Sequence, residues 1–328
     1  MKIRALLLAV VLGGSLLSVP AQAATQLSVG VAYDIGGRGD KSFNDASAAG
    51  LDKAQKQFDF NLEAVVTDGT SADREKRIRS LITKSCNPII AIGAGYASTL
   101  QALSVEFPNT HFAIINDASV AALNVTSVIF ANTQGAYLAG FSAAQVSKTG
   151  KVAMIANPEQ ADIYKDGFSA GVFASKKKVI PIIKYVSGSY SAATNQVIDA
   201  GADVLFVATQ GSDSEVFKVI VARNAKKKGS NIGLINVEPD QYITVTSATK
   251  KFLIASVVKR VDKAIYDIIA LSAAKKQYLD ILDADAGIYG RRYGITGGGI
   301  EFTIRSKELS ALSGSINIAA ATAEKIPA

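Results

Sequence analysis

Short apolar runs rich in β-branched residues alternate with amphipathic stretches along the chain from residue 27 onward. The runs have the length of buried strands, and the stretches between them carry apolar residues at helical spacing. The expected strands are 27–33, 62–66, 88–92, 111–115, 125–130, 151–155, 180–186, 203–207 and 231–237. The expected helices are 43–57, 71–84, 97–106, 133–147, 161–175, 190–200, 212–228 and 257–276. This alternation predicts an α/β fold of parallel sheets with helices on both faces.

The length of 328 residues favours two sheets over one continuous sheet. A division near residue 131 gives two halves that each begin a new strand–helix series. The stretch 251–269 begins like a strand and continues as a helix, and the glycine-rich stretch 293–302 offers a further crossing. We expect two doubly wound lobes joined by a three-segment hinge. The first lobe is 24–131 plus about 257–292, and the second is 132–256 plus about 293–328.

Residues 1–23 have the features of a secretory signal peptide. Lys2 and Arg4 precede an apolar run from Ala5 to Leu17, and a small-x-small site ends at Ala23. A membrane anchor is the alternative, but the run is shorter than the ~20 residues that span a bilayer. We expect cleavage after Ala23 and export to the periplasm or cell envelope. No cysteine ends the leader, so no lipid anchor is expected there.

Cys86 is the only cysteine and His111 the only histidine. Neither a disulfide within the chain nor a Cys/His metal cluster can therefore form, and we expect no cofactor. Removing Lys2 and Arg4 lowers the formal net charge from +7 to +5. Such a modest basic excess is typical of solvated helix ends and loops. The leader occupies the place of an N-terminal helix-turn-helix, so we expect no nucleic-acid partner.

Polar side chains follow several of the expected strands, where α/β sheets bind ligands. Asp34 follows the first strand, Asn116 and Asp117 follow "FAII", and Glu238 follows "GLINV". After Asp34, three glycines allow a tight turn, and Ser42 with Asp45 has the spacing of a helix capping box.

Phe43 is expected in the first turn of the following helix. An isolated Phe at this position would ordinarily begin an apolar core stripe. Beside an acid and an amide, however, an aromatic ring suits a ligand with one flat apolar face and several hydroxyls.

Enzymatic alternatives find little support in the sequence. Gly37, Gly39 and Ser42 match a dinucleotide-binding fingerprint only in part. Asp68 lies too many residues after the glycines to be the acidic residue that this fingerprint requires. No G-x-S-x-G elbow, P-loop or HExxH motif occurs. The acids are scattered without a catalytic pairing, so we expect a protein that is not an enzyme.

Several motifs together resemble one known family. The stretch "DIGGRGDKSFND" is similar to the opening of the basic membrane protein family, the solute-binding components of ABC transporters typified by purine nucleoside receptors. The likeness continues through "FAIIND", "NVTSVIFANTQGAYLAGFSAA", "GFSAGV", "EPDQY" and "ASVVKRVDKAIYDII". It implies a type I periplasmic-binding-protein fold whose two lobes close on a nucleoside.

The resemblance also implies roles for individual residues. Phe43 matches the family's first base-stacking aromatic. Tyr164 stands where the second is usually phenylalanine. Asp34 and Asn44 match the acid and amide around the first aromatic.

Base-edge recognition matches the acid after "FAII", which leaves Asn116 and Asp117 both open as the residue that contacts the base. The family's ribose-binding acid falls on Glu238 in "NVEPDQ", and its partner lysine falls on Lys259. We expect a monomeric receptor that delivers a purine nucleoside to an ABC permease. A same-fold receptor for a pyrimidine nucleoside or sugar-like signal, or an extracellular nucleoside-processing enzyme, remain the alternatives.

Overall fold

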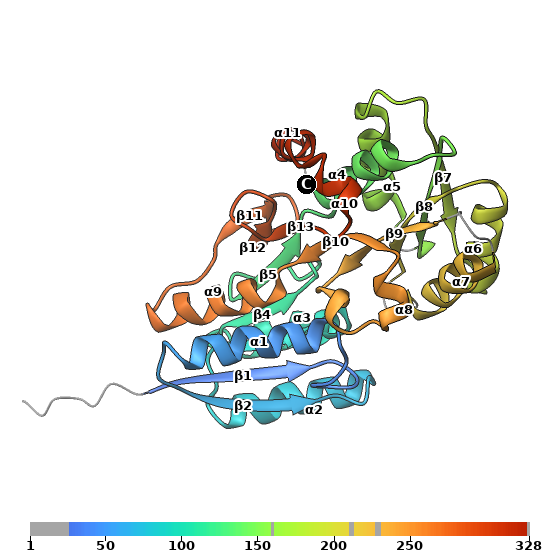
Figure 1. Ribbon diagram of the computed structural model, residues 1–328. Helices are drawn as coiled ribbons and strands as arrows, with labels where there is room; N and C mark the ends of the chain where they lie inside the picture. Colours follow the sequence, from blue (N-terminus) through green and yellow to red (C-terminus); the bar gives the residue numbers. More distant parts are fainter. Residues whose placement is uncertain (1–25, 159–160, 210–212, 227–230, 327–328) are drawn as a thin grey trace, which may run out of the picture.

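The computed structural model describes residues 26–158, 161–209, 213–226 and 231–326, and two β-sheets form the framework of this part of the chain (Figure 1). Seven strands form the first sheet, in the spatial order β11 (Asp280–Asp283), β12 (Ile288–Tyr293), β5 (Val125–Phe130), β4 (Phe112–Ile115), β3 (Ile89–Ile92), β1 (Leu27–Tyr33) and β2 (Phe60–Val66). Six form the second, in the order β13 (Ile300–Ile304), β10 (Leu253–Lys259), β9 (Gly233–Glu238), β8 (Val204–Ala208), β6 (Lys151–Ala156) and β7 (Ile180–Tyr185). Only the edge pairs β11–β12 and β10–β13 are antiparallel.

Helices cover both faces of each sheet. Beside the first sheet lie α1 (Phe43–Gln55), α2 (Ser71–Thr83), α3 (Ala97–Glu106) and α9 (Val261–Ala273). The second half carries α4 (Asn132–Val146), α5 (Ala161–Ala174), α6 (Tyr190–Asp199), α7 (Asp213–Lys226), α8 (Ser247–Lys250), α10 (Lys307–Ser310) and α11 (Ser313–Ala323). Side chains alternate along β1, so Val31 packs in the core with α1 and α9, whereas Ala32 packs in the core with α2 and α3. The parallel sheets with helices on both faces are those that the alternating pattern predicts, and together they form the type I periplasmic-binding-protein fold that the resemblance implies.

The chain passes between the two sheets three times, from β5 to α4, from β10 to α9, and from β12 to β13. The three crossings are tied to one another by backbone groups. The Ala131 N–H donates to the Tyr293 carbonyl at 2.8 Å, and the Arg260 N–H donates to the Gly299 carbonyl at 2.9 Å. The third crossing therefore lies between the first and the second.

Each of the nine expected strand ranges contains a strand, but the prediction for 257–276 is partly wrong. Residues up to Lys259 belong to β10, and the helix begins at Val261. The reason is tertiary: β10 lies between β9 and β13, whose ladders satisfy its backbone groups. The strands β11, β12 and β13 and the helix α11 were not predicted, because their apolar residues are interrupted by charged or small residues.

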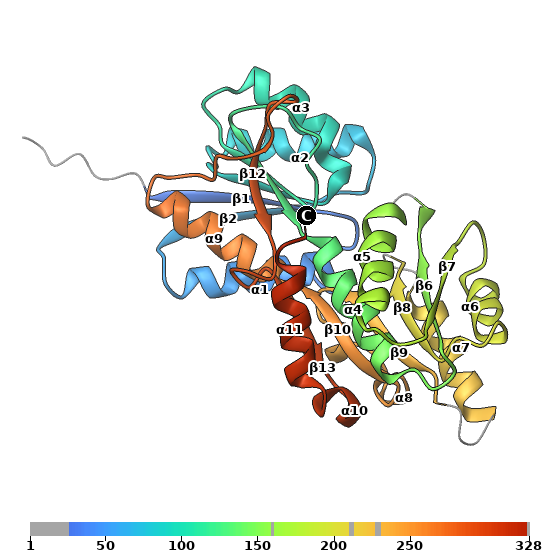
Figure 2. The ribbon, with the colours of Figure 1, turned by 90° about the horizontal axis from the view of Figure 1, so that it is seen from above.

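Glycines bring α4 and α5, which lie side by side in Figure 2, into direct backbone contact. A Cβ atom on Gly140 would lie 2.0 Å from the carbonyl oxygen of Phe168, and one on Gly171 would lie 2.0 Å from that of Tyr137. No side chain fits at either position without separating the two helices. This close approach fixes α5, which carries Tyr164, against α4.

We expect Gly171→Ala to lower the free energy of unfolding by about 1–3 kcal/mol, because overpacking outweighs the ~0.5–1 kcal/mol gained in helix propensity. Urea denaturation measures this difference. Gly314→Ala is the matched control, because it lies in α11 with no atom within 4 Å of its added Cβ. The control should be neutral or more stable, and equal stability of Gly171→Ala and wild type would contradict the close packing.

Candidate functional site

A cavity of about 410 Å³ lies where residues following β1, β3 and β4 face the end of β9. Its walls thus come from both sheets, at the carboxyl ends of their parallel strands, where α/β folds bind ligands. Of the eight residues predicted from the sequence, those that line it are Asp34, Phe43, Asn44, Asn116 and Glu238.

The loop between β1 and α1 is held by the carboxylates of two aspartates. Asp40 accepts hydrogen bonds from the backbone N–H groups of Ser42, Asn44 and Asp45 at 2.8–3.1 Å. Asp45 accepts in turn from the N–H groups of Gly39 and Lys41. The predicted Ser42–Asp45 capping box is wrong, because the Ser42 side chain accepts no capping bond and Asp40 takes that place.

The side-chain amide of Asn44 fixes the same loop. Its Oδ1 accepts from the Asp34 N–H at 3.0 Å, and its Nδ2 donates to the carbonyls of Asp34 and Ile35 at 3.3 Å. The amide is therefore engaged by backbone on both sides. Asn44 borders the cavity, but it acts first by positioning Asp34 and the neighbouring ring of Phe43.

Asp34 is paired with an arginine that the sequence did not point to. Arg74 in α2 donates from Nη2 to Asp34 Oδ1 at 2.8 Å and from Nη1 to the Gly69 carbonyl at 2.6 Å. Its guanidinium also lies over the ring of Tyr96, 5.5 Å from the centroid. Arg74 thus fixes one carboxylate oxygen of Asp34, while the other lies beside Gly93.

Glu238 and Lys259 end the adjacent strands β9 and β10 and are almost fully buried, with 2% and 1% of their surfaces exposed. Neither Glu238 Oε2 nor Lys259 Nζ has a hydrogen-bond partner among the described residues. Burial raises the pKa of Glu238 from its usual 4.5 to about 7, against the opposing effect of the Lys259 charge. Glu238 and Lys259 are thus neighbouring buried charged groups whose hydrogen-bonding capacity is not fully used within the described residues.

The two aromatic residues expected to stack on a base have different surroundings. Phe43 lines the cavity, but Tyr164 is 1% exposed and packs edge-on against Phe206, with centroids 5.9 Å apart. The Lys259 ammonium lies 5.7 Å from the Phe43 centroid and 5.6 Å from the Tyr164 centroid. Stacking on Tyr164 stays a prediction about a ligand-bound state.

The two residues after β4 differ in placement. Asn116 has a positive φ of 66°, donates its N–H to the Val128 carbonyl and lines the cavity. The Asp117 carboxylate instead accepts from the N–H and the hydroxyl of Ser119 at 2.8 and 2.6 Å. Of the two candidates for contacting a base, Asn116 is the one beside the cavity.

Asp213, at the start of α7, is a further buried acid near the site. It accepts hydrogen bonds from Thr209 and Gln241, and burial raises its pKa. Unlike Asp34 and Glu238, which directly follow predicted strands, Asp213 lies six residues after the predicted strand 203–207, so the rule that pointed to the other two acids did not point to it. For Arg74 there was no signal either, because 40 residues and two strand–helix boundaries separate it from Asp34.

Comparison with known proteins adds the family. The chain matches the sequence profile described as "ABC transporter substrate-binding protein PnrA-like" over residues 27–315. This chain belongs to the Bmp family. Members of this family are solute-binding proteins, whose function implies a ligand and an ABC permease partner.

Several known proteins are similar over about two thirds to three quarters of the chain. The CD4+ T-cell-stimulating antigen of Listeria innocua is 30% identical, over 75% of this chain and 74% of that protein. The ABC transporter nucleoside-binding protein BmpA of Lactococcus lactis is 26% identical, over 74% of each. Basic membrane protein A1 of Borrelia garinii is 30% identical, over 64% of this chain and 65% of that protein.

Solved structures agree on the fold. A transcriptional activator of the comK gene from Bacillus halodurans superposes with a TM-score of 0.72 at 20% identity, covering 92% of this chain and all of that one. An ABC transporter solute-binding protein from Aeropyrum pernix gives 0.66 at 22% identity, covering 91% and 86%. At these identities the likeness concerns the fold alone.

The predicted leader, residues 1–23, lies outside the described residues. Among the helices from residue 26 onward that the structure describes, none combines the length and the apolar character needed to cross a bilayer.

The raised pKa of Glu238 predicts a pH-dependent stability. The folded state binds the Glu238 proton more tightly than the unfolded chain does. The contribution of Glu238 to the free energy of unfolding is therefore greatest below pH 4.5, decreases up to about pH 7 and is constant above it. Relative to Glu238→Gln, wild type should lose about 3 kcal/mol of unfolding free energy between pH 4.5 and 8. Urea titrations of both proteins across this range test it, and parallel pH profiles would contradict the assignment.

Proposed function

We propose that this protein is an exported receptor of an ABC importer, and that it binds a purine nucleoside between two closing lobes. The observation that carries the proposal is the buried pair Glu238 and Lys259, whose Oε2 and Nζ lack partners among the described residues beside a cavity that Phe43 lines. A carboxylate can accept from both vicinal hydroxyls of a ribose, and an ammonium can donate to a ribose oxygen. The relative named as nucleoside-binding in Lactococcus lactis supports this ligand class.

In this proposal the opposite wall contacts the base. The Phe43 ring covers its apolar face, and Asn116 offers both a donor and an acceptor to its edge. The free oxygen of Asp34 accepts a further donor, while Arg74 holds the carboxylate in place. The Tyr164 ring, whose centroid lies 5.6 Å from Lys259 Nζ, is proposed to complete the stacking when the lobes close.

Closure requires two bodies that move about the crossings. We propose the lobes 24–131 plus about 257–292 and 132–256 plus about 293–328, acting as a monomer. A hinge of a few residues is enough to absorb such a rotation. In this proposal the leader 1–23 is cleaved on export, and the mature protein works in the periplasm or cell envelope.

Two alternatives remain distinguishable. A pyrimidine nucleoside or a sugar-like signal would use the same hydroxyl-binding pair, and titration with each class separates them. An enzyme would need a positioned base and an activated nucleophile, whereas Asp34 is held by Arg74 and Asp213 by Thr209 and Gln241. Incubation with nucleoside followed by chromatography, in which the ligand should be recovered intact, tests the enzyme reading.

The ribose is the feature that Glu238 and Lys259 are proposed to bind. Hydrogen bonds to charged groups contribute about 1.5–3 kcal/mol, so a 2′-deoxynucleoside should bind roughly 10- to 150-fold more weakly than the nucleoside. Lys259→Met should cause a similar loss and shrink the preference for ribose. Calorimetric titration of both proteins with both ligands measures this, and equal wild-type affinities for the two sugars would exclude the assignment.

The base edge gives a matched pair of variants. We expect Asn116→Ala to weaken nucleoside binding by about 2- to 10-fold, since a neutral hydrogen bond contributes about 0.5–1.5 kcal/mol. Asp117→Ala should change affinity less than about 2-fold, because that carboxylate is engaged by Ser119. Titration of the two variants side by side decides between them. A larger loss for Asp117→Ala would reverse the assignment.

A further inference from the structure

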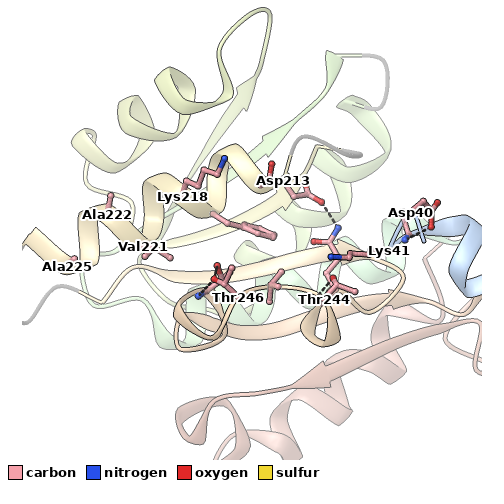
Figure 3. A pocket seen from close by; sticks show the side chains of 15 residues that line it. Asp40, Lys41, Asp213, Lys218, Val221, Ala222, Ala225, Thr244 and Thr246 are labelled. Atoms are coloured by element: carbon pink, nitrogen blue, oxygen red, sulfur yellow. Dashed lines mark hydrogen bonds between the residues drawn. The ribbon is translucent and has the colours of Figure 1, made fainter. Parts of the chain in front are cut away.

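A second cavity of about 530 Å³ lies along α7 (Figure 3) and shares lining residues with the candidate site. One wall is α7, with Val221, Ala222 and Ala225, and the opposite wall carries Thr244 and Thr246. Lining residues extend from Asp213 to Ala225, which corresponds to about 18 Å along a helix. This α7 groove is longer than the space that a nucleoside needs.

The α7 groove and the candidate site share the β1–α1 loop. Asp40 and Ser42 line both cavities, and the charges of Asp40 and Asp213 both act on Glu238. The groove therefore opens beside the carboxylate proposed to bind ribose. Beyond this junction its floor is mainly apolar, with Phe217, Val221 and Val245 among the lining residues.

The chemistry of the lining limits what can occupy the groove. Largely apolar concave surfaces favour apolar groups, since each buried methylene is removed from water. The vicinal ribose hydroxyls are engaged by Glu238 in the proposed function, so the sugar position left free for a substituent is the 5′ carbon.

We propose that the receptor accepts nucleosides carrying an apolar 5′ substituent, such as an alkyl thioether, and that this substituent lies in the α7 groove. The inference rests on the proposed function, because the nucleoside places the substituent at the groove entrance. It goes beyond that function by specifying the 5′ substituent of the ligand and α7 as the helix that contacts it.

The test is a titration series with a nucleoside and its 5′-S-methyl, 5′-S-butyl and 5′-S-octyl derivatives. Full burial of a methylene corresponds to about a 4-fold gain in affinity, and partial burial to about 2-fold. From methyl to butyl, the wild-type affinity should therefore rise by about 8- to 60-fold. A flat series with intact binding of the parent nucleoside would overturn the inference and leave the proposed function standing. Failure of the parent nucleoside itself to bind would overturn both.

Variants of the protein show whether the 5′ alkyl substituent occupies the α7 groove. Ala222→Asp and Ala225→Asp place a charge in it at exposed helical positions, where folding should tolerate the change. Each should abolish most of the butyl-over-methyl gain and leave affinity for the parent nucleoside within about 2-fold. Ala170→Asp, on the exposed surface of α5, is the matched control and should keep the full gain. If both groove variants kept the full gain in affinity from the methyl to the butyl derivative, the 5′ substituent would lie elsewhere.

Discussion

Glu238 and Lys259 are withdrawn from water at the ends of neighbouring strands, and their burial sets the chemistry of the whole site. Removing ions from water costs several kcal/mol each, and their mutual attraction offsets that cost only when the remaining donors and acceptors are satisfied. Within the described residues, Glu238 Oε2 and Lys259 Nζ are not satisfied. In the proposed function, the hydroxyl groups of the ribose satisfy these atoms and offset part of this cost.

The two walls of the cavity differ in how many of their polar groups are hydrogen-bonded within the protein. In the first wall, Asp40 and Asn44 are saturated by backbone groups of the β1–α1 loop, and Arg74 holds one oxygen of Asp34. That wall is preorganised, so little side-chain entropy is lost when a ligand binds to it. The second wall carries the unsatisfied pair. The rigid first wall can fix the orientation of a ligand, and the unsatisfied groups of the second wall can add hydrogen bonds to it.

The sequence predicted the parts of this architecture that follow from local pattern. Apolar runs identified nine strands, and polar residues after strands identified Asp34, Asn116 and Glu238, which line one cavity. What it missed depends on distant partners. The sequence indicated a strand at the start of 251–269 but began the helix at residue 257, whereas β10 continues to Lys259 because β9 and β13 flank it. Likewise, the pairing of Arg74 with Asp34 joins segments 40 positions apart, and no local pattern encodes it.

Closure links the two walls energetically. A ligand shifts a conformational equilibrium only by the difference in its affinity for the two states. Contacts to Phe43 and Asn116 alone, or to Glu238 alone, would leave open and closed forms equally favoured, because each wall is complete within one half of the chain. In the proposed function, a nucleoside that contacts both walls at once binds the closed form more tightly. The backbone bonds Ala131–Tyr293 and Arg260–Gly299 tie the crossing segments together, so the proposed rotation is confined to a narrow bundle next to Lys259. Lys259 ends β10 directly before the second crossing, so the proposed ribose contact and the proposed hinge are adjacent along the chain.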